Sequence, residues 1–309
     1  MKRRTNIGLL TALAFCAAGT PAHAQEDPVA LVIRVQGDVA VRHAGAEPAP
    51  ATVGERMYVG DGVLPQSGSR AILITRTGGQ QVVTEQTTLS EPRGAGNPDI
   101  FARAMSTLAQ AAATDVTAGG RQGMIRPLTC GIAPVAPRNG LLVAAPTPTF
   151  EWTGVEGQTY DLMVRDLDGG QPLIFEVGSD TTFTVPGDAA LTQGATYAWT
   201  VFVGGRRGGR PCEQQEFRVM SLEESVDLED YMDEIAVFGL DPMTDGLFLT
   251  VVAYRDLGLY YEAHDALVTV ERQANLSADL YLLKGEILAE LGHEEAAREA
   301  FDRADEMMR

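Results

Sequence analysis

Short apolar runs separated by glycine-rich turns fill the first part of the chain. The runs 31–35 and 39–42 flank Gly37, and a further run lies at 71–74. Strands of this length, repeated at intervals of about ten residues, are typical of small all-β units. The pattern predicts an all-β domain over residues 27–92.

A helix is expected after this domain. Asn97 is a capping residue and Pro98 suits the first helical position. Residues 114–126 contain three glycines and indicate a linker. We therefore predict a helix and linker over 97–126. The apolar residues on one face of this helix are Ile100, Phe101, Ala104, Met105, Leu108 and Ala112.

Residues 128–220 show the period of two that marks half-buried strands. Alternation is clear at 160–164 and again at 197–203. Six or seven short strands in about 90 residues favour an antiparallel β-sandwich. Both tryptophans occupy alternating strand positions, so we expect them between the sheets; carbohydrate stacking is the alternative.

The last part of the chain, residues 221–309, has the period of a helix and an internal repeat. Gly258 and Gly292 are 34 residues apart, and the same shift relates Ala263 to Ala297. The glycines end the first helix of each pair, and the alanines let paired helices approach closely. We predict two helical repeats preceded by one amphipathic helix.

The order of residues in the first β domain resembles the FecR domain. That family is named for an iron-uptake regulator that relays a signal from an outer-membrane receptor to a sigma factor. Only six residues precede the first apolar stretch, so we expect the domain without the regulation. The matching pieces are Gly37-Asp38-Val39, Val53-Gly54, Met57, Gly60-Asp61, Ser69-Arg70-Ala71-Ile72-Leu73, Gly79, and Thr87 with Leu89.

The second β domain resembles fibronectin type III-like and bacterial Ig-like domains. The resemblance is carried by the residues 148–152, 160–162 and 191–199. It implies a sandwich with Trp152 and Trp199 in its core.

The 34-residue period resembles the tetratricopeptide repeat. The resemblance implies a concave, peptide-binding face made by the first helices, although the same positions also fit plain solvated helix faces. Self-association through a short two-repeat array is a further expected contact. The residues that the resemblance assigns to the binding face are Asp245, Phe248, Val252, Arg255, Asp256, Asp279, Leu282, Glu286 and Glu290.

Residues 1–24 have the form of a secretory signal peptide. Three basic residues precede the apolar stretch 7–18, and small residues stand at positions 22 and 24. We predict cleavage between Ala24 and Gln25 and a periplasmic or secreted protein. An uncleaved anchor and lipidation at Cys16 are the alternatives, but Phe15 does not fit a lipobox. The mature chain offers no apolar stretch long enough for a transmembrane helix.

Charge narrows the choice of partner. The chain has a net charge of −18. Residues 221–309 hold 22 acidic and six basic side chains. Such an acidic chain is poorly suited to neutralising phosphates, so nucleic acid is not expected as a partner. In the first β domain, the arginines expected on a solvated face, with a basic contact face as the alternative, are Arg42, Arg56, Arg70 and Arg76.

The mature chain has two cysteines, Cys130 and Cys212, which nearly bracket the second β domain. In an oxidising compartment such a pair is most simply a disulfide.

No residue set points to catalysis. The mature chain has His43, His264 and His293, none of them spaced for metal binding or next to a nucleophile elbow. The segment 166–177 lacks the glycine and the last carboxylate of a calcium loop. We predict no catalytic, cofactor or metal site. The expected function is a non-enzymatic exported binding or scaffold protein of the bacterial envelope, contacting an unidentified envelope protein. A polysaccharide- or peptidoglycan-binding module and a secreted enzyme are the alternatives.

Overall fold

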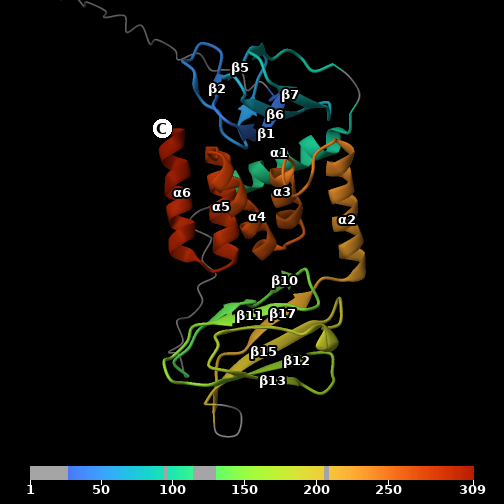
Figure 1. Ribbon diagram of the computed structural model, residues 1–309, viewed down its shortest axis with the longest axis vertical. Coiled ribbons are helices and arrows are strands. Elements are labelled where there is room, and N and C mark those ends of the chain that lie inside the picture. Colours follow the sequence, from blue (N-terminus) through green and yellow to red (C-terminus); the bar gives the residue numbers. More distant parts are fainter. Residues whose placement is uncertain (1–26, 94–95, 114–129, 205–208) are drawn as a thin grey trace, which may run out of the picture.

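Three bodies are stacked along the long axis of the molecule (Figure 1). The computed structural model describes residues 27–93, 96–113, 130–204 and 209–309. The helices that close the sequence form a layer between the two β domains (Figure 1). This multidomain β plus α architecture confirms the predicted fold class. The predicted signal peptide, its Ala24–Gln25 cleavage site and the predicted linker lie outside the described residues.

The first β domain consists of two four-stranded sheets, in the orders β4-β1-β6-β7 and β3-β2-β5-β8. The strand β1 carries an unbroken apolar run because both its faces are covered: Leu31, Val32 and Ile33 are all buried. Its partner β6 is buried in the same way. The strands are β1 Ala30–Gln36, β2 Val39–Arg42, β3 Ala49–Pro50, β4 Arg56–Met57, β5 Gly62–Pro65, β6 Arg70–Thr75, β7 Gln80–Val83 and β8 Thr87–Thr88.

The helix α1, Pro98–Ala113, crosses between this domain and the helical layer (Figure 1). Asn97 caps it, since its Oδ1 accepts a hydrogen bond from the amide of Asp99 at 3.1 Å. One face of α1 is fully covered. The buried residues on that face are Ile100, Phe101, Ala104, Thr107, Leu108 and Ala111.

The second β domain is a β-sandwich. Its larger sheet has the order β10-β17-β15-β12-β13, with β16 beside β15, and its smaller sheet is β14-β11-β9. All described pairs are antiparallel except β10 with β17. Its strands are β9 Pro134–Ala136, β10 Leu141–Val143, β11 Thr149–Trp152, β12 Tyr160–Asp166, β13 Leu173–Gly178, β14 Thr182–Thr184, β15 Thr196–Val203, β16 Arg210–Pro211 and β17 Gln215–Val219.

Aromatic side chains fill the sandwich. Trp152 and Trp199 are 3% and 1% exposed. Phe150 packs edge-on against Trp199, with ring centroids 5.2 Å apart. The indole of Trp199 donates a hydrogen bond to the carbonyl of Pro137 at 2.8 Å. Both tryptophans therefore belong to the core, as their alternation predicted. The predicted disulfide between Cys130 and Cys212 is confirmed.

The C-terminal region forms a leading helix and two helical hairpins. Gly258 and Gly292 follow α3 and α5 with φ of 77° and 73°, a conformation that glycine adopts without strain. None of the described helices is long and apolar enough to cross a membrane. The helices are α2 Leu222–Val237, α3 Leu247–Asp256, α4 Tyr260–Gln273, α5 Ala278–Glu290 and α6 Glu294–Met308.

The crossing of α5 and α6 depends on Gly285. A Cβ at this position would lie 2.5 Å from the ring of Phe301, which packs directly onto the helix backbone. We expect Gly285→Ala to lower the free energy of unfolding by about 1–3 kcal/mol, because the buried ring must shift. Gly187→Ala is the control, since a Cβ there meets no atom within 4 Å. Urea denaturation measures both; equal effects would contradict this packing.

Candidate functional site: the seam between the β domain and the helices

The first β domain and the helical layer meet along a close contact, which we call the seam. It comprises strands β1 and β6 and residues 52–56 on one side, and α3, α5 and the loops before these two helices on the other. The backbone itself joins here: Val53 accepts a hydrogen bond from the amide of Ser277 and donates one to the carbonyl of Asn275, each at 2.9 Å. Gly54 has φ 82°, and a Cβ there would lie 2.7 Å from Leu280 and Ser277. The two modules are thus in direct backbone contact.

Ion pairs reinforce the seam. Arg56 Nε lies 2.8 Å from Asp279 Oδ2, and Asp245 lies 3.5 Å from both Arg34 and Arg70. Burial raises the pKa of Asp279, while the charge of Arg56 lowers it. Arg56 and Arg70 were expected on a solvated face; the structure places both beside acidic residues of the helices instead.

The helix α1 covers the inner side of α3 and α5. Thr107 donates a hydrogen bond to Asp256 at 2.9 Å, and Arg255 donates one to Gln110, also at 2.9 Å. Arg255 also pairs with Glu286 at 2.6 Å. Arg255, Asp256 and Glu286 of the repeat face are therefore bonded within the chain.

Eight of the nine residues predicted to form a partner-binding repeat face are engaged in this way. Phe248, Val252 and Leu282 are buried in the core shared with α1 and the β domain. Asp256 and Glu290 are the exposed members of the nine, and of these two Asp256 is still bonded to Thr107. The chain covers its own repeat face, so a partner must either displace α1 or bind elsewhere. The period that predicted the helices carries no information about what covers them.

A pocket of about 1010 Å³ opens at one end of the seam. It lies between the β domain, the start of α5 and the end of α6. Its rim is apolar, with Val59, Met307 and Met308 exposed. The polar residues that line it are His43, Thr52, Glu55, Arg56, Tyr58, Asp61, Ser277 and Asp279.

His43 bridges two carboxylates in this pocket. Its Nδ1 lies 2.8 Å from Asp61 Oδ2, and its Nε2 lies 3.1 Å from Glu55 Oε1. Burial lowers the pKa of His43, but hydrogen bonds and charges from Asp61 and Glu55 outweigh it, so the pKa lies above its ordinary value. The imidazolium donates to both acids, which neutral imidazole cannot do.

The two carboxylates are held by the backbone. Asp61 is 2% exposed and accepts hydrogen bonds from the amides of Ala44 and Tyr58. Glu55 accepts from the amide and hydroxyl of Thr52. The cluster is therefore an internal clamp on the β domain. The sequence gave no sign of the partners of His43, because they lie 12 and 18 residues away.

The chemistry of the pocket is that of a paired network. Ser277 lines the pocket at the start of α5. Its hydroxyl caps the helix by accepting a hydrogen bond from the amide of Leu280. No group of three His, Cys, Asp or Glu side chains among the described residues has the geometry to hold a metal ion. The arrangement stabilises the junction, and its open apolar rim is the part that remains available for contact.

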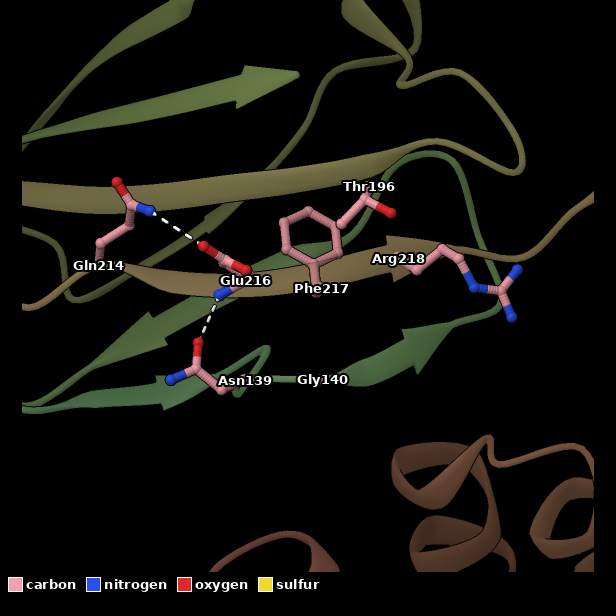
Figure 2. A pocket seen from close by; sticks show the side chains of 7 residues that line it. All are labelled: Asn139, Gly140, Thr196, Gln214, Glu216, Phe217 and Arg218. Carbon is pink, nitrogen blue, oxygen red and sulfur yellow. Dashed lines mark hydrogen bonds between the residues drawn. The ribbon is translucent and has the colours of Figure 1, made fainter. Parts of the chain in front are cut away.

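A second, smaller pocket of about 420 Å³ lies on the sandwich (Figure 2). Asn139 accepts a hydrogen bond from the amide of Glu216 at 2.6 Å, and Gln214 donates to its carboxylate at 3.4 Å. Arg218 extends away from Glu216 (Figure 2) and pairs with Glu224 at 2.6 Å. These polar groups serve the strand edge and the start of α2, and they do not converge on a reacting centre.

The sandwich is joined to the opposite side of the helices. Arg138 donates a hydrogen bond to the carbonyl of Leu291, at the end of α5, at 3.1 Å. The partial negative charge at this end of the helix also favours a cation. The amide of Ala144 donates to Glu262 at 3.2 Å. Burial raises the pKa of Glu262, although hydrogen bonds from the backbone lower it. Both β domains therefore contact the helices through specific polar bonds.

Comparisons with known proteins give no assignment. No family model matches the chain, and no curated protein matches it. A solved cell surface anchoring domain is 14% identical, covering 21% of this chain and 86% of that one, with a TM-score of 0.19. A segment of two fibronectin type III domains from chicken tenascin is 9% identical over 63% of this chain and 95% of that one, with a TM-score of 0.22. A β-1,2-glucanase from Parabacteroides distasonis is 10% identical over 90% of this chain and 49% of that one, with a TM-score of 0.24. Similarity this low carries no argument about fold or function.

The His43 clamp makes stability depend on pH. Because its folded pKa is raised, the stabilisation is fully present below the unfolded pKa of about 6.5 and is lost as pH rises through the folded value. We expect His43→Gln to destabilise the protein more at about pH 5.5 than at about pH 8.5. Urea denaturation at both values tests this. In a Glu55→Gln background the pH dependence of the effect should shrink; an unchanged dependence would contradict the clamp.

The seam pair offers a charge-reversal test. Arg56→Asp places two acids together and should lower the free energy of unfolding by about 1 kcal/mol, since both partners are only partly buried. Adding Asp279→Arg should restore part of the loss. Arg76→Asp, at the more exposed pair with Glu91, should cost less. If the double variant is no more stable than Arg56→Asp alone, the pair does not hold the seam.

Proposed function

We propose that this chain is an exported, non-enzymatic scaffold of the bacterial envelope that acts through protein–protein contacts. The observation that carries the proposal is the coverage of the repeat face by α1 and the β domain. Eight of its nine predicted contact residues serve the chain itself. The three modules therefore act as one body and not as three independent binding units. A partner would bind the outer surfaces of that body.

Three resemblances enter the proposal on the residues described above. We take the first module as FecR-like, the sandwich as Ig- or fibronectin type III-like, and the hairpins as tetratricopeptide-like. The disulfide fits an extracellular or envelope compartment. Periplasmic or secreted localisation and export through residues 1–24 are part of the proposal.

The absence of an enzymatic role is also proposed. Of the titratable groups in the seam pocket, His43 is hydrogen-bonded to both Glu55 and Asp61, and Asp279 forms an ion pair with Arg56. A general base needs a free lone pair within reach of a substrate. Paired groups of this kind favour a structural role over catalysis.

Polysaccharide binding is less well supported than protein binding. Such modules stack sugars on exposed aromatic rings, whereas no aromatic side chain of the described part of the sandwich is exposed. Phe175 and Phe183 are partly buried, and they pack against each other with ring centroids 4.7 Å apart. The acidic helices fit a protein partner better than a neutral polymer.

Affinity capture tests the proposal. The chain from Gln25 onward, immobilised and incubated with envelope extract, should retain a defined protein. Protease treatment of the extract beforehand should abolish the retention. Digestion of glycans in the extract should leave it unchanged. Retention of polysaccharide with no protein would replace the scaffold by the polysaccharide-binding alternative.

A further inference from the structure

The two ends of the helical array have different surfaces. At one end, the described outer side of α6 is polar, with Glu294, Arg298 and Asp302 exposed. At the other end stands α2, whose inner residues Tyr231 and Ile235 are buried. Repeat arrays need a polar outer face at each end to stay soluble. The end formed by α6 has such a face. Apolar residues on the outer face of α2, at the other end, would therefore need a separate explanation.

The outer side of α2 carries apolar residues in register. Leu222, Val226 and Val237 are 70%, 47% and 86% exposed, and the first and last are the most exposed large apolar side chains in the described part of the chain. At 100° per residue they fall within an arc of about 60°, along a helix about 24 Å long. Single exposed apolar residues are ordinary, but three within one arc of a helix make that face a candidate for interaction, here with Asp233 between Val226 and Val237.

Acidic side chains surround these residues. Glu229, Asp230 and Asp233 lie exposed on the same side, between Val226 and Val237. The helix holds seven acidic residues and no basic residue. Arg218 from the sandwich pairs with Glu224 on its flank. Two copies of this face would repel each other, whereas a basic partner would be attracted.

We propose that the outer face of α2 binds an amphipathic helix of a basic partner protein. The apolar side chains of that helix lie against Leu222, Val226 and Val237, and its lysines or arginines face Glu229, Asp230 and Asp233. This is helix-to-helix recognition in which apolar contacts supply affinity and charges supply selection. The inference rests on the proposed scaffold function and names the chemistry of its partner.

A designed peptide of about 18 residues provides the probe, with leucines at i, i+4 spacing and lysines elsewhere. Calorimetry at about 0.15 M salt should show binding to the chain from Gln25 onward. The variant Val226→Asp, Val237→Asp removes two apolar contacts and adds two negative charges. If binding were only nonspecific attraction between charges, this variant would bind the lysine-rich peptide more tightly. We expect affinity to fall about tenfold or more, because buried apolar area is lost. Unchanged or tighter binding would overturn the proposal.

A matched control has the same change of charge elsewhere. Val155→Asp with Leu167→Asp alters two exposed apolar residues of the sandwich, which are 40% and 39% exposed, and it should leave affinity within about twofold of the parent. Val226→Ser with Val237→Ser repeats the test should the acidic variant fold poorly, as judged by circular dichroism. A scrambled peptide that lacks the apolar stripe should bind weakly; equal binding would count against α2.

Two further outcomes separate the inference from the function on which it rests. If envelope capture retains the same protein on the parent and on the Val226→Asp, Val237→Asp variant, the scaffold function stands and the α2 site falls. If sedimentation shows a dimer that this variant dissociates, the occupant is a second copy and the basic partner is ruled out. Loss of both the captured protein and the peptide on this variant, with the control unaffected, supports the site.

Discussion

The burial of strand β1 on both faces is the constraint on which the rest of this structure depends. Leu31, Val32 and Ile33 cannot all point into one sheet interface, because successive side chains of a strand alternate. One side is covered within the β domain, and the other needs a second apolar layer. The helices α1, α3 and α5 supply it, and a single core runs from the β domain through the helical layer. The first β domain is therefore completed by residues at the far end of the sequence.

This packing explains why the repeat face is occupied. A concave face of helices usually exposes apolar side chains that bind a ligand. Here Phe248 and Val252 are buried in the core that α1 helps to form. The polar positions follow, since Asp245 and Asp279 pair with arginines of the β domain. The acidic character of the helices is thereby divided: part is neutralised at the seam, and part faces outward on α2. The outward part is the one that the proposed partner would meet.

The seam pocket shows how a site with catalytic residue types can serve structure. His43, Asp61 and Glu55 would suit proton transfer if their own lone pairs were free and faced a substrate. Each carboxylate instead accepts three hydrogen bonds, from backbone amides, a hydroxyl or the imidazole. Groups bonded in this way hold loops in place, and they do so most firmly when the histidine is charged. The apolar rim around them is the more available part of the pocket.

The sequence by itself determined the elements and their local ends. Periods of two and of 3.6 residues distinguished strands from helices, Gly258 and Gly292 marked where α3 and α5 stop, and alternation placed both tryptophans in the sandwich core. Two cysteines in a chain expected to be exported predicted the disulfide. These features depend on neighbours within a few residues or on elimination among few candidates. Local patterns state which side chains are buried, but not what buries them.

Only the tertiary structure decided that α1 and the β domain cover the repeat face, that Arg56 faces Asp279, and that His43 bridges two acids. The seam joins residues far apart in the sequence, such as Arg34 with the carbonyl of Thr244, 210 residues away, and even the partners of His43 lie beyond the reach of a local pattern. Contacts of that range depend on how whole modules dock. Docking is set by the total apolar area that can be removed from water, and no single segment of the chain encodes that total.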